Sequence, residues 1–137
     1  MIAINIGLKG SGKTKKLIDA VNSAIKNEKG NVVCITDGNR LMHDIDREAR
    51  MVNTEPFDIK NFDMFSGLLC GIIAQDYDVT HIFIDSIFKS VPSENMEDLD
   101  VFVKTLEALE AKFGVSFTMM GSAAEDTATP NVKKYIV

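Results

Sequence analysis

The first 26 residues of the chain place a glycine-rich octet between two segments of different periodicity. The octet is Gly7-Leu8-Lys9-Gly10-Ser11-Gly12-Lys13-Thr14. Before it, residues 2–6 form a short, isoleucine-rich apolar run, which is typical of a buried strand. After it, residues 14–26 place their apolar side chains on one side of a helix. The order of strand, glycine loop and helix predicts one βα unit of an α/β fold.

The octet matches the pattern G-x-x-x-x-G-K-[ST] of a phosphate-binding loop. Glycines allow the loop backbone to adopt positive φ angles, and its N–H groups then converge on an anion at the start of the helix. We expect Lys13 to reach the β- and γ-phosphates and the Thr14 hydroxyl to bind Mg²⁺. Lys9 either adds charge near the phosphates or faces water. The predicted nucleotide-binding residues are Gly7, Lys9, Gly10, Ser11, Gly12, Lys13, Thr14 and Lys15.

Strands and helices alternate along the rest of the chain. Continuous apolar strands between amphipathic helices predict a parallel sheet covered on both faces. We therefore expect a single three-layer α/β/α domain over residues 1–137, with a mainly parallel sheet of about five strands. The further strands are predicted at 32–36, 81–85 and 115–120, with weaker candidates at 57–59 and 133–137, and the further helices at 40–52, 61–75 and 96–113.

Asp85 ends the apolar run Ile82-Phe83-Ile84. In a parallel α/β sheet, ligands bind beyond the carboxyl ends of the strands, so Asp85 and the octet are expected at the same edge. A carboxylate there can help to hold Mg²⁺ opposite Thr14. An ordinary aspartate in the turn after a strand is the alternative.

With the octet as a Walker A motif and Ile82 to Asp85 as a Walker B motif, nearly the whole chain resembles the P-loop NTPase superfamily. The layout resembles the RecA-like and thymidine-kinase-like branches, and also short bacterial proteins sometimes labelled twitching-motility ATPases. The resemblance implies a P-loop NTPase fold and Mg²⁺-dependent nucleotide hydrolysis with Lys13 in a catalytic role. The chain has no N-K-x-D segment of the kind that reads guanine, so ATP is favoured over GTP.

The chain departs from this superfamily at Ser86. Many ATPases of this type have a glutamate there that polarises the attacking water, and a serine alone is a poor general base. Asp37, after the strand at 32–36, lies on the same edge and is the candidate catalytic residue. Its alternative role is to cap a helix that begins near Arg40.

Two loops near this edge hold further candidates. The loop 86–94 contains apolar residues that form a lid, contact a substrate or a protein, or tuck under the next helix. The loop after the strand at 115–120 holds polar residues that contact a γ-phosphate or simply face water. These residues are Ile87, Phe88 and Val91 in the first loop and Ser122, Glu125 and Asp126 in the second.

The three arginines, Arg40, Arg47 and Arg50, share one face of the helix predicted over 40–52. This face would meet the nucleotide, the nucleotide of a neighbouring subunit, or an acidic partner. In the alternative interpretation, Asp44 and Asp46 pair with these arginines on an exposed helix.

The composition indicates the cellular compartment and limits the kinds of partner. A net charge of −5 argues against a general nucleic-acid binder. No signal peptide or membrane-spanning run is recognised, which favours a cytoplasmic location. Cys34 and Cys70 lie in apolar contexts and are expected to be buried free thiols. Gly67 and Gly71 predict close packing of their helix on the sheet, or a subunit interface.

Three functions fit the sequence. The first is a slow or partner-activated Mg²⁺-dependent ATPase or switch, with a protein partner or a second copy completing the site. The second is a nucleotide-dependent binding module without turnover, which Ser86 favours. The third is a small-molecule kinase that uses a base such as Asp37.

Overall fold

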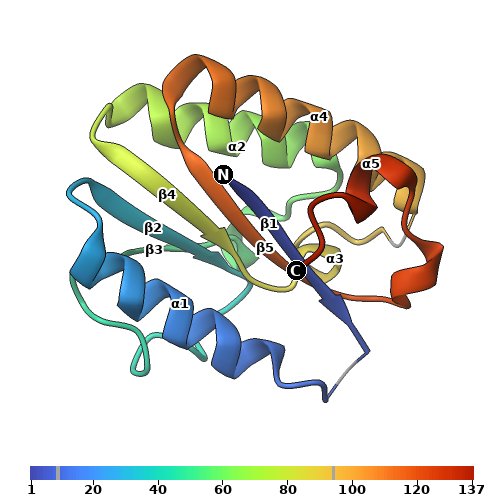
Figure 1. Ribbon diagram of the computed structural model, residues 1–137. Helices are drawn as coiled ribbons and strands as arrows, with labels where there is room; N and C mark the ends of the chain where they lie inside the picture. Colours follow the sequence, from blue (N-terminus) through green and yellow to red (C-terminus); the bar gives the residue numbers. More distant parts are fainter. Residues whose placement is uncertain (9, 94) are drawn as a thin grey trace.

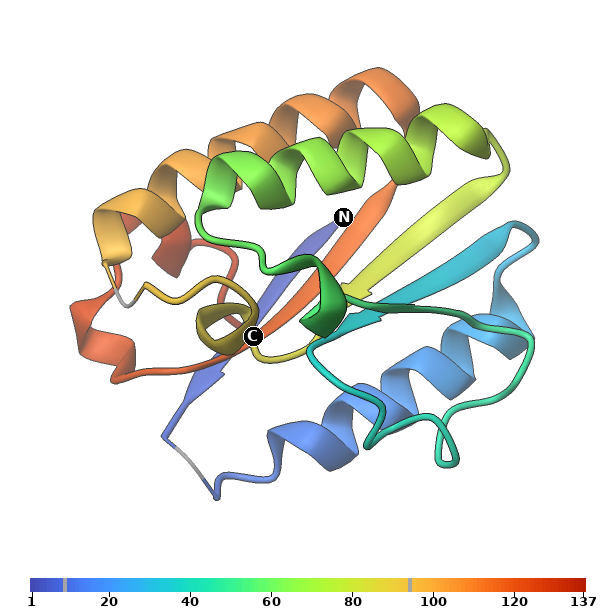
Figure 2. The same cartoon turned by 180° about the vertical axis from the view of Figure 1, so that it is seen from behind.

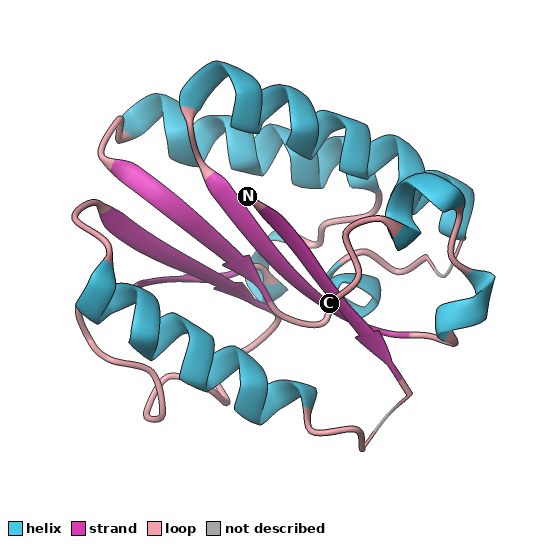
Figure 3. Ribbon diagram, in the orientation of Figure 1, coloured by secondary structure: helices cyan, strands magenta, loops and turns pink. Residues whose placement is uncertain are grey.

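The computed structural model describes residues 1–8, 10–93 and 95–137. It consists of a five-stranded, all-parallel sheet in the order β1-β5-β4-β2-β3, with helices on both faces (Figures 1 and 3). The predicted three-layer α/β/α fold is therefore confirmed. The strands are β1 (Ile2–Gly7), β2 (Asn31–Thr36), β3 (Arg50–Asn53), β4 (Val79–Ile84) and β5 (Ser116–Ser122). The helices are α1 (Lys13–Asn27), α2 (Phe62–Gln75), α3 (Ile87–Ser90), α4 (Met96–Phe113) and α5 (Pro130–Lys133), with 3₁₀ turns at Glu55–Phe57 and Glu125–Thr127.

The two faces of the sheet are covered by different helices. Helix α1 lies on one face and helices α2 and α4 lie on the other (Figures 1 and 2). Strand β4 illustrates why: successive side chains of a strand point to opposite faces. Ile82 and Ile84 are buried in the cluster with α2 and α4, whereas Phe83 is buried in the cluster with α1. Continuously apolar strands are therefore what a sheet between two helical layers requires.

The register of the strands brings the end of β1 close to the end of β4. Strand β5 lies between them, and its Met119 pairs with Ile4 on one side and Ile84 on the other. Gly7 is opposite Ser122 in the same ladder. The loop after β1 and the residue after β4 therefore leave the sheet at the same edge, as predicted.

The prediction of a helix over residues 40–52 is wrong. Residues 40–49 form a series of turns, and β3 follows directly as an edge strand beside β2. The side chain of Asn22 on α1 binds this segment, because its Nδ2 donates to the carbonyl of Asp44 and its Oδ1 accepts from the N–H of Asp46. Asp46 also accepts the N–H of Glu48 on its side chain. Such local side-chain bonds to the backbone compete with helical bonds.

Other expectations fail in smaller ways. Residues 57–59 form no strand, since Pro56 belongs to a 3₁₀ turn. The segment 133–137 forms one parallel bridge, between Ile4 and Ile136, in place of a strand. Gly67 and Gly71 face solvent, and a Cβ atom at either would meet nothing within 4 Å, so they do not pack closely on the sheet.

The ends of α4 match the sequence. The Asn95 side chain accepts the N–H groups of Glu97 and Asp98, and Gly114 follows the helix with φ 69°. None of the helices in the described part of the chain has the length and apolar composition needed to cross a bilayer.

The two cysteines differ in exposure. Cys34 is buried, as expected, but Cys70 is exposed, because it lies on the outer side of α2. Burial, and secondarily the charge of Asp85, raises the pKa of the Cys34 thiol to about 12. We expect a disulfide reagent such as DTNB to titrate Cys70 alone in the native protein at pH 8, and both thiols after denaturation in guanidinium. Rapid release of two equivalents from the native protein would contradict the buried position of Cys34.

His81 lies in β4 near the amino ends of the strands. Its Nδ1 is 2.7 Å from Glu28 Oε2 and its Nε2 is 2.8 Å from Thr118 Oγ1. Burial lowers the pKa of His81 below its ordinary value of 6.5, and the hydrogen bond to Glu28 opposes this only in part. The folded protein therefore holds a neutral ring that donates to Glu28 and accepts from Thr118.

This neutral ring predicts a pH dependence of stability. Below pH 6.5 the unfolded chain takes up a proton at His81 that the folded protein does not, so the free energy of unfolding falls as the pH falls. Urea unfolding between pH 7.5 and 5.5 should show a shallower decline for His81→Gln than for the wild type. Identical slopes for the two proteins would show that His81 does not titrate differently on folding.

Candidate functional site

The octet runs from the last residue of β1 to the first two residues of α1. Gly10 and Gly12 have φ angles of 89° and 83°, which favour glycine, and Gly12 immediately precedes α1. Gly7 allows a close approach, since a Cβ atom there would lie 2.8 Å from Ser11 Oγ. Lys9 lies outside the described residues. Gly10 and Gly12 therefore have the positive φ angles that the motif favours, whereas Gly7 is the last residue of β1.

Lys13 is folded back over this loop. Its Nζ donates to the carbonyls of Gly7 and Leu8 at 3.0 and 2.9 Å and to Ser11 Oγ at 3.2 Å. These contacts hold the ammonium group beside the loop and at the start of α1, where the helix dipole is positive. Both features favour a negatively charged ligand.

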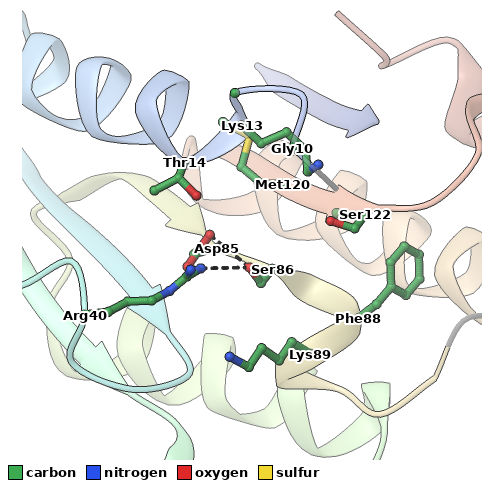
Figure 4. Close-up of a pocket in the computed structure, with 12 residues that line it drawn as sticks. Gly10, Lys13, Thr14, Arg40, Asp85, Ser86, Phe88, Lys89, Met120 and Ser122 are labelled. Atoms are coloured by element: carbon green, nitrogen blue, oxygen red, sulfur yellow. Dashed lines mark hydrogen bonds and ion pairs between the residues drawn. The ribbon is translucent and has the colours of Figure 1, made fainter. Parts of the chain in front are cut away.

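Lys13 lines a cavity of about 720 Å³ at the carboxyl edge of the sheet (Figure 4). Its walls come from the octet, from the segment after β2, from the two residues between β4 and α3, from α3, and from the end of β5. The lining residues are Gly10, Gly12, Lys13, Thr14, Arg40, Asp85, Ser86, Phe88, Lys89, Met120, Gly121 and Ser122.

The cavity separates the predicted site residues into two groups. Gly10, Gly12, Lys13, Thr14 and Asp85 line it together, as do Ser86 and Ser122. The cavity lining does not include Gly7, Ser11, Lys15 or Asp37, nor the further candidates Glu125 and Asp126. Asp37 directly follows β2, and the helix that it was expected to cap does not form.

Asp85 is a buried carboxylate with two partners. Its Oδ2 accepts from Arg40 Nη2 at 2.9 Å, and its Oδ1 accepts from Ser86 Oγ at 3.1 Å. The Asp85 side chain is 5% exposed, whereas the Arg40 side chain is 50% exposed. Arg40 therefore pairs with Asp85 and not with Asp44. Arg50 likewise pairs with Asp76, at 2.7 Å, and not with Asp46.

Lys89 is a lining residue that the sequence analysis missed. In Figure 4 the octet residues Lys13 and Thr14 lie on one side of Asp85, and Arg40 and Lys89 lie on the other. Among the described lining residues, three side chains are cationic and Asp85 is the only carboxylate. The described side chains that line this cavity therefore carry a net positive charge, although the whole protein has a net charge of −5.

Helix α3 positions Phe88 and Lys89. Ile87 in α3 and Val91 directly after it are buried, as in the alternative in which these apolar residues tuck inward, whereas Phe88 lines the cavity. Gly121 makes this packing possible, because a Cβ atom there would lie 3.1 Å from the Phe88 ring and 3.2 Å from Ile87.

Thr14 and Asp85 bring two oxygen donors to this cavity that could help to hold a metal ion. A hydroxyl and a carboxylate are oxygen ligands suited to Mg²⁺, which usually takes few protein ligands and keeps water and phosphate oxygens. The described residues contain no group of three or more His, Cys, Asp or Glu side chains that could hold a metal ion unaided. Thr14 and Asp85 could hold Mg²⁺ together with water or ligand oxygens.

No family model matches this chain, and a comparison with curated proteins found no similar sequence.

Proposed function

We propose that this cavity binds ATP together with Mg²⁺ and that the protein is a slow or partner-activated ATPase or switch of the P-loop type. The observation that carries the proposal is the convergence of Gly12, Lys13 and Thr14 with Asp85 on one positively charged cavity. A chance match to the motif would not require a buried carboxylate directly after β4 to line the same cavity.

Each group has a role in this proposal. The Lys13 ammonium exchanges its loop acceptors for oxygens of the β- and γ-phosphates. The first N–H groups of α1 bind phosphate oxygens at the positive end of the helix dipole. Thr14 and Asp85 hold Mg²⁺, which neutralises phosphate charge when bound. ATP is favoured over GTP because the sequence lacks a guanine-reading segment.

We expect slow turnover because the described lining residues offer no free general base. Asp85 is the only carboxylate among the described lining residues, and it already accepts two hydrogen bonds. Ser86, the next residue, donates to Asp85 and is not a base. A protein partner or a second copy would supply the missing group. The same observation favours a second candidate, a binding module that changes conformation with ATP and does not turn it over.

Equilibrium binding and phosphate release test the proposal. We expect ATP to bind in the presence of Mg²⁺, with phosphate release that is slow and rises with protein concentration if a second copy completes the site. Binding without release would favour the binding module, and transfer of phosphate to an added small molecule would favour a kinase. Absence of ATP binding would refute the proposal.

A reducing compartment such as the cytoplasm suits this function and the free thiols.

A further inference from the structure

Arg40 and the proposed metal compete for one carboxylate. Arg40 Nη2 lies 2.9 Å from Asp85 Oδ2 and 3.3 Å from Ser86 Oγ. Asp85 is buried, and its other oxygen accepts a hydrogen bond from the Ser86 hydroxyl. A guanidinium charge at this distance repels a second cation bound to the same carboxylate, so each positive group weakens the binding of the other to Asp85.

Arg40 has room to move when it leaves Asp85. Its side chain is half exposed, while the Asp85 side chain is almost fully buried. The neighbouring Gly38 has φ 109°, and Asn39 is exposed, whereas Leu41 is buried against α1. The backbone is thus anchored directly after Arg40, and the long side chain can swing about that anchor.

The cavity supplies the second position for the guanidinium group. Arg40 lines it together with Lys13 and Thr14, which mark the phosphate end of the site (Figure 4). A guanidinium group is always charged and binds phosphate oxygens through two parallel N–H bonds. The terminal phosphate of a triphosphate therefore offers Arg40 a replacement for the carboxylate that it gives up.

We propose that Arg40 is a latch that senses the terminal phosphate. In the nucleotide-free protein it pairs with Asp85, and in the triphosphate complex it transfers to the γ-phosphate and leaves Asp85 to the metal. A diphosphate displaces Arg40 from Asp85 without giving it this new partner. This inference rests on the proposed nucleotide binding, and it assigns the discrimination between triphosphate and diphosphate to one residue.

The test compares two nucleotides in three proteins by calorimetry. The nucleotides are ADP and the non-hydrolysable ATP analogue AMP-PNP, each with Mg²⁺, and the proteins are wild type, Arg40→Ala and Arg47→Ala. Arg47 is the matched control, because it is an exposed arginine of the same segment that lies outside the cavity lining. Melting temperatures confirm that each variant is folded.

Arg40→Ala should lower the affinity for AMP-PNP by about tenfold or more, as expected for loss of a charged hydrogen-bonded contact. The affinity for ADP should be unchanged or higher. In the presence of ADP, the half-saturating Mg²⁺ concentration of Arg40→Ala should be about two- to fivefold lower than that of the wild type. The reason is that the partly exposed arginine no longer competes with Mg²⁺ for Asp85. Arg40→Lys should lie between wild type and Arg40→Ala for AMP-PNP. Arg47→Ala should match the wild type.

The outcomes separate two failures. If the wild type binds both nucleotides and Arg40→Ala keeps the wild-type ratio of AMP-PNP to ADP affinity, the latch is refuted and nucleotide binding stands. If the folded wild type binds neither nucleotide, the proposed function is refuted and the latch with it. An equal loss of both nucleotides in Arg40→Ala would show a general electrostatic effect and would also overturn the latch.

Discussion

Lys13→Ala should weaken ATP binding by about hundredfold, roughly 3 kcal/mol, because it removes the cation that faces the phosphates. Phosphate release should fall to the background rate. The melting temperature should change little, since the three hydrogen bonds of Nζ involve only the loop and none of the buried core. Binding of a fluorescent ATP analogue, with thermal unfolding of the same samples, provides the measurement.

Lys26→Ala is the control for this variant. Lys26 is exposed in the last turn of the same helix, at the end opposite the cavity, and its loss alters net charge equally. We expect wild-type affinity from it. If the two variants weakened ATP binding alike, long-range attraction between a cationic surface and the nucleotide would replace a phosphate contact by Lys13 as the explanation.

Asp85→Asn should raise the Mg²⁺ concentration needed for half-maximal ATP binding by about tenfold or more, because a neutral amide is a much weaker Mg²⁺ ligand than a carboxylate. Phosphate release, where present, should fall by about hundredfold. The amide keeps the size of the carboxylate and can still accept from Arg40, so the protein should remain folded. Titration with Mg²⁺ at fixed ATP measures the shift, and Asp19→Asn on the exposed side of α1 is the control.

The opposite result for Asp85 has a definite meaning. An unchanged Mg²⁺ dependence together with a lower melting temperature would assign Asp85 to the turn after β4, where it would serve only to hold Arg40 and Ser86. That outcome would leave the octet as the sole basis for nucleotide binding.

The part of the site that could be predicted depends on local sequence and on one topological rule. The loop around Gly12 and Lys13 is specified by neighbouring residues, because positive φ angles favour glycine there. Asp85 joins it from 71 residues further along the chain than Thr14 because the carboxyl ends of parallel strands share one edge. Neither step requires knowledge of side-chain packing.

The segment after β2 could not be predicted in the same way. Leu41, Ile45 and Ala49 recur at a helical spacing and are all buried, so the pattern predicts a helix. Asn22 on α1 stabilises the turns instead, because its side chain binds the backbone at Asp44 and Asp46. Periodicity reports which side chains are buried, and a tertiary hydrogen bond can satisfy the same burial with turns.

The lining residue Lys89 was missed for a related reason. Helix α3 is only one turn long, too short for periodicity to identify. Its position depends on contact between Phe88 and the bare backbone of Gly121 on β5. Such a contact between distant segments leaves no pattern in either segment alone.

Strand β1 carries the octet and lies at the outer edge of the sheet, where unpaired backbone groups could recruit another strand. At Ile4 this edge is closed, since its N–H donates to the Tyr135 carbonyl and its carbonyl accepts from the Val137 N–H. Tyr135 is itself tied to α4 by a hydrogen bond from its hydroxyl to Glu107. The tail thereby protects β1 against intermolecular sheet extension, and none of residues 133–137 is among the described residues that line the candidate site.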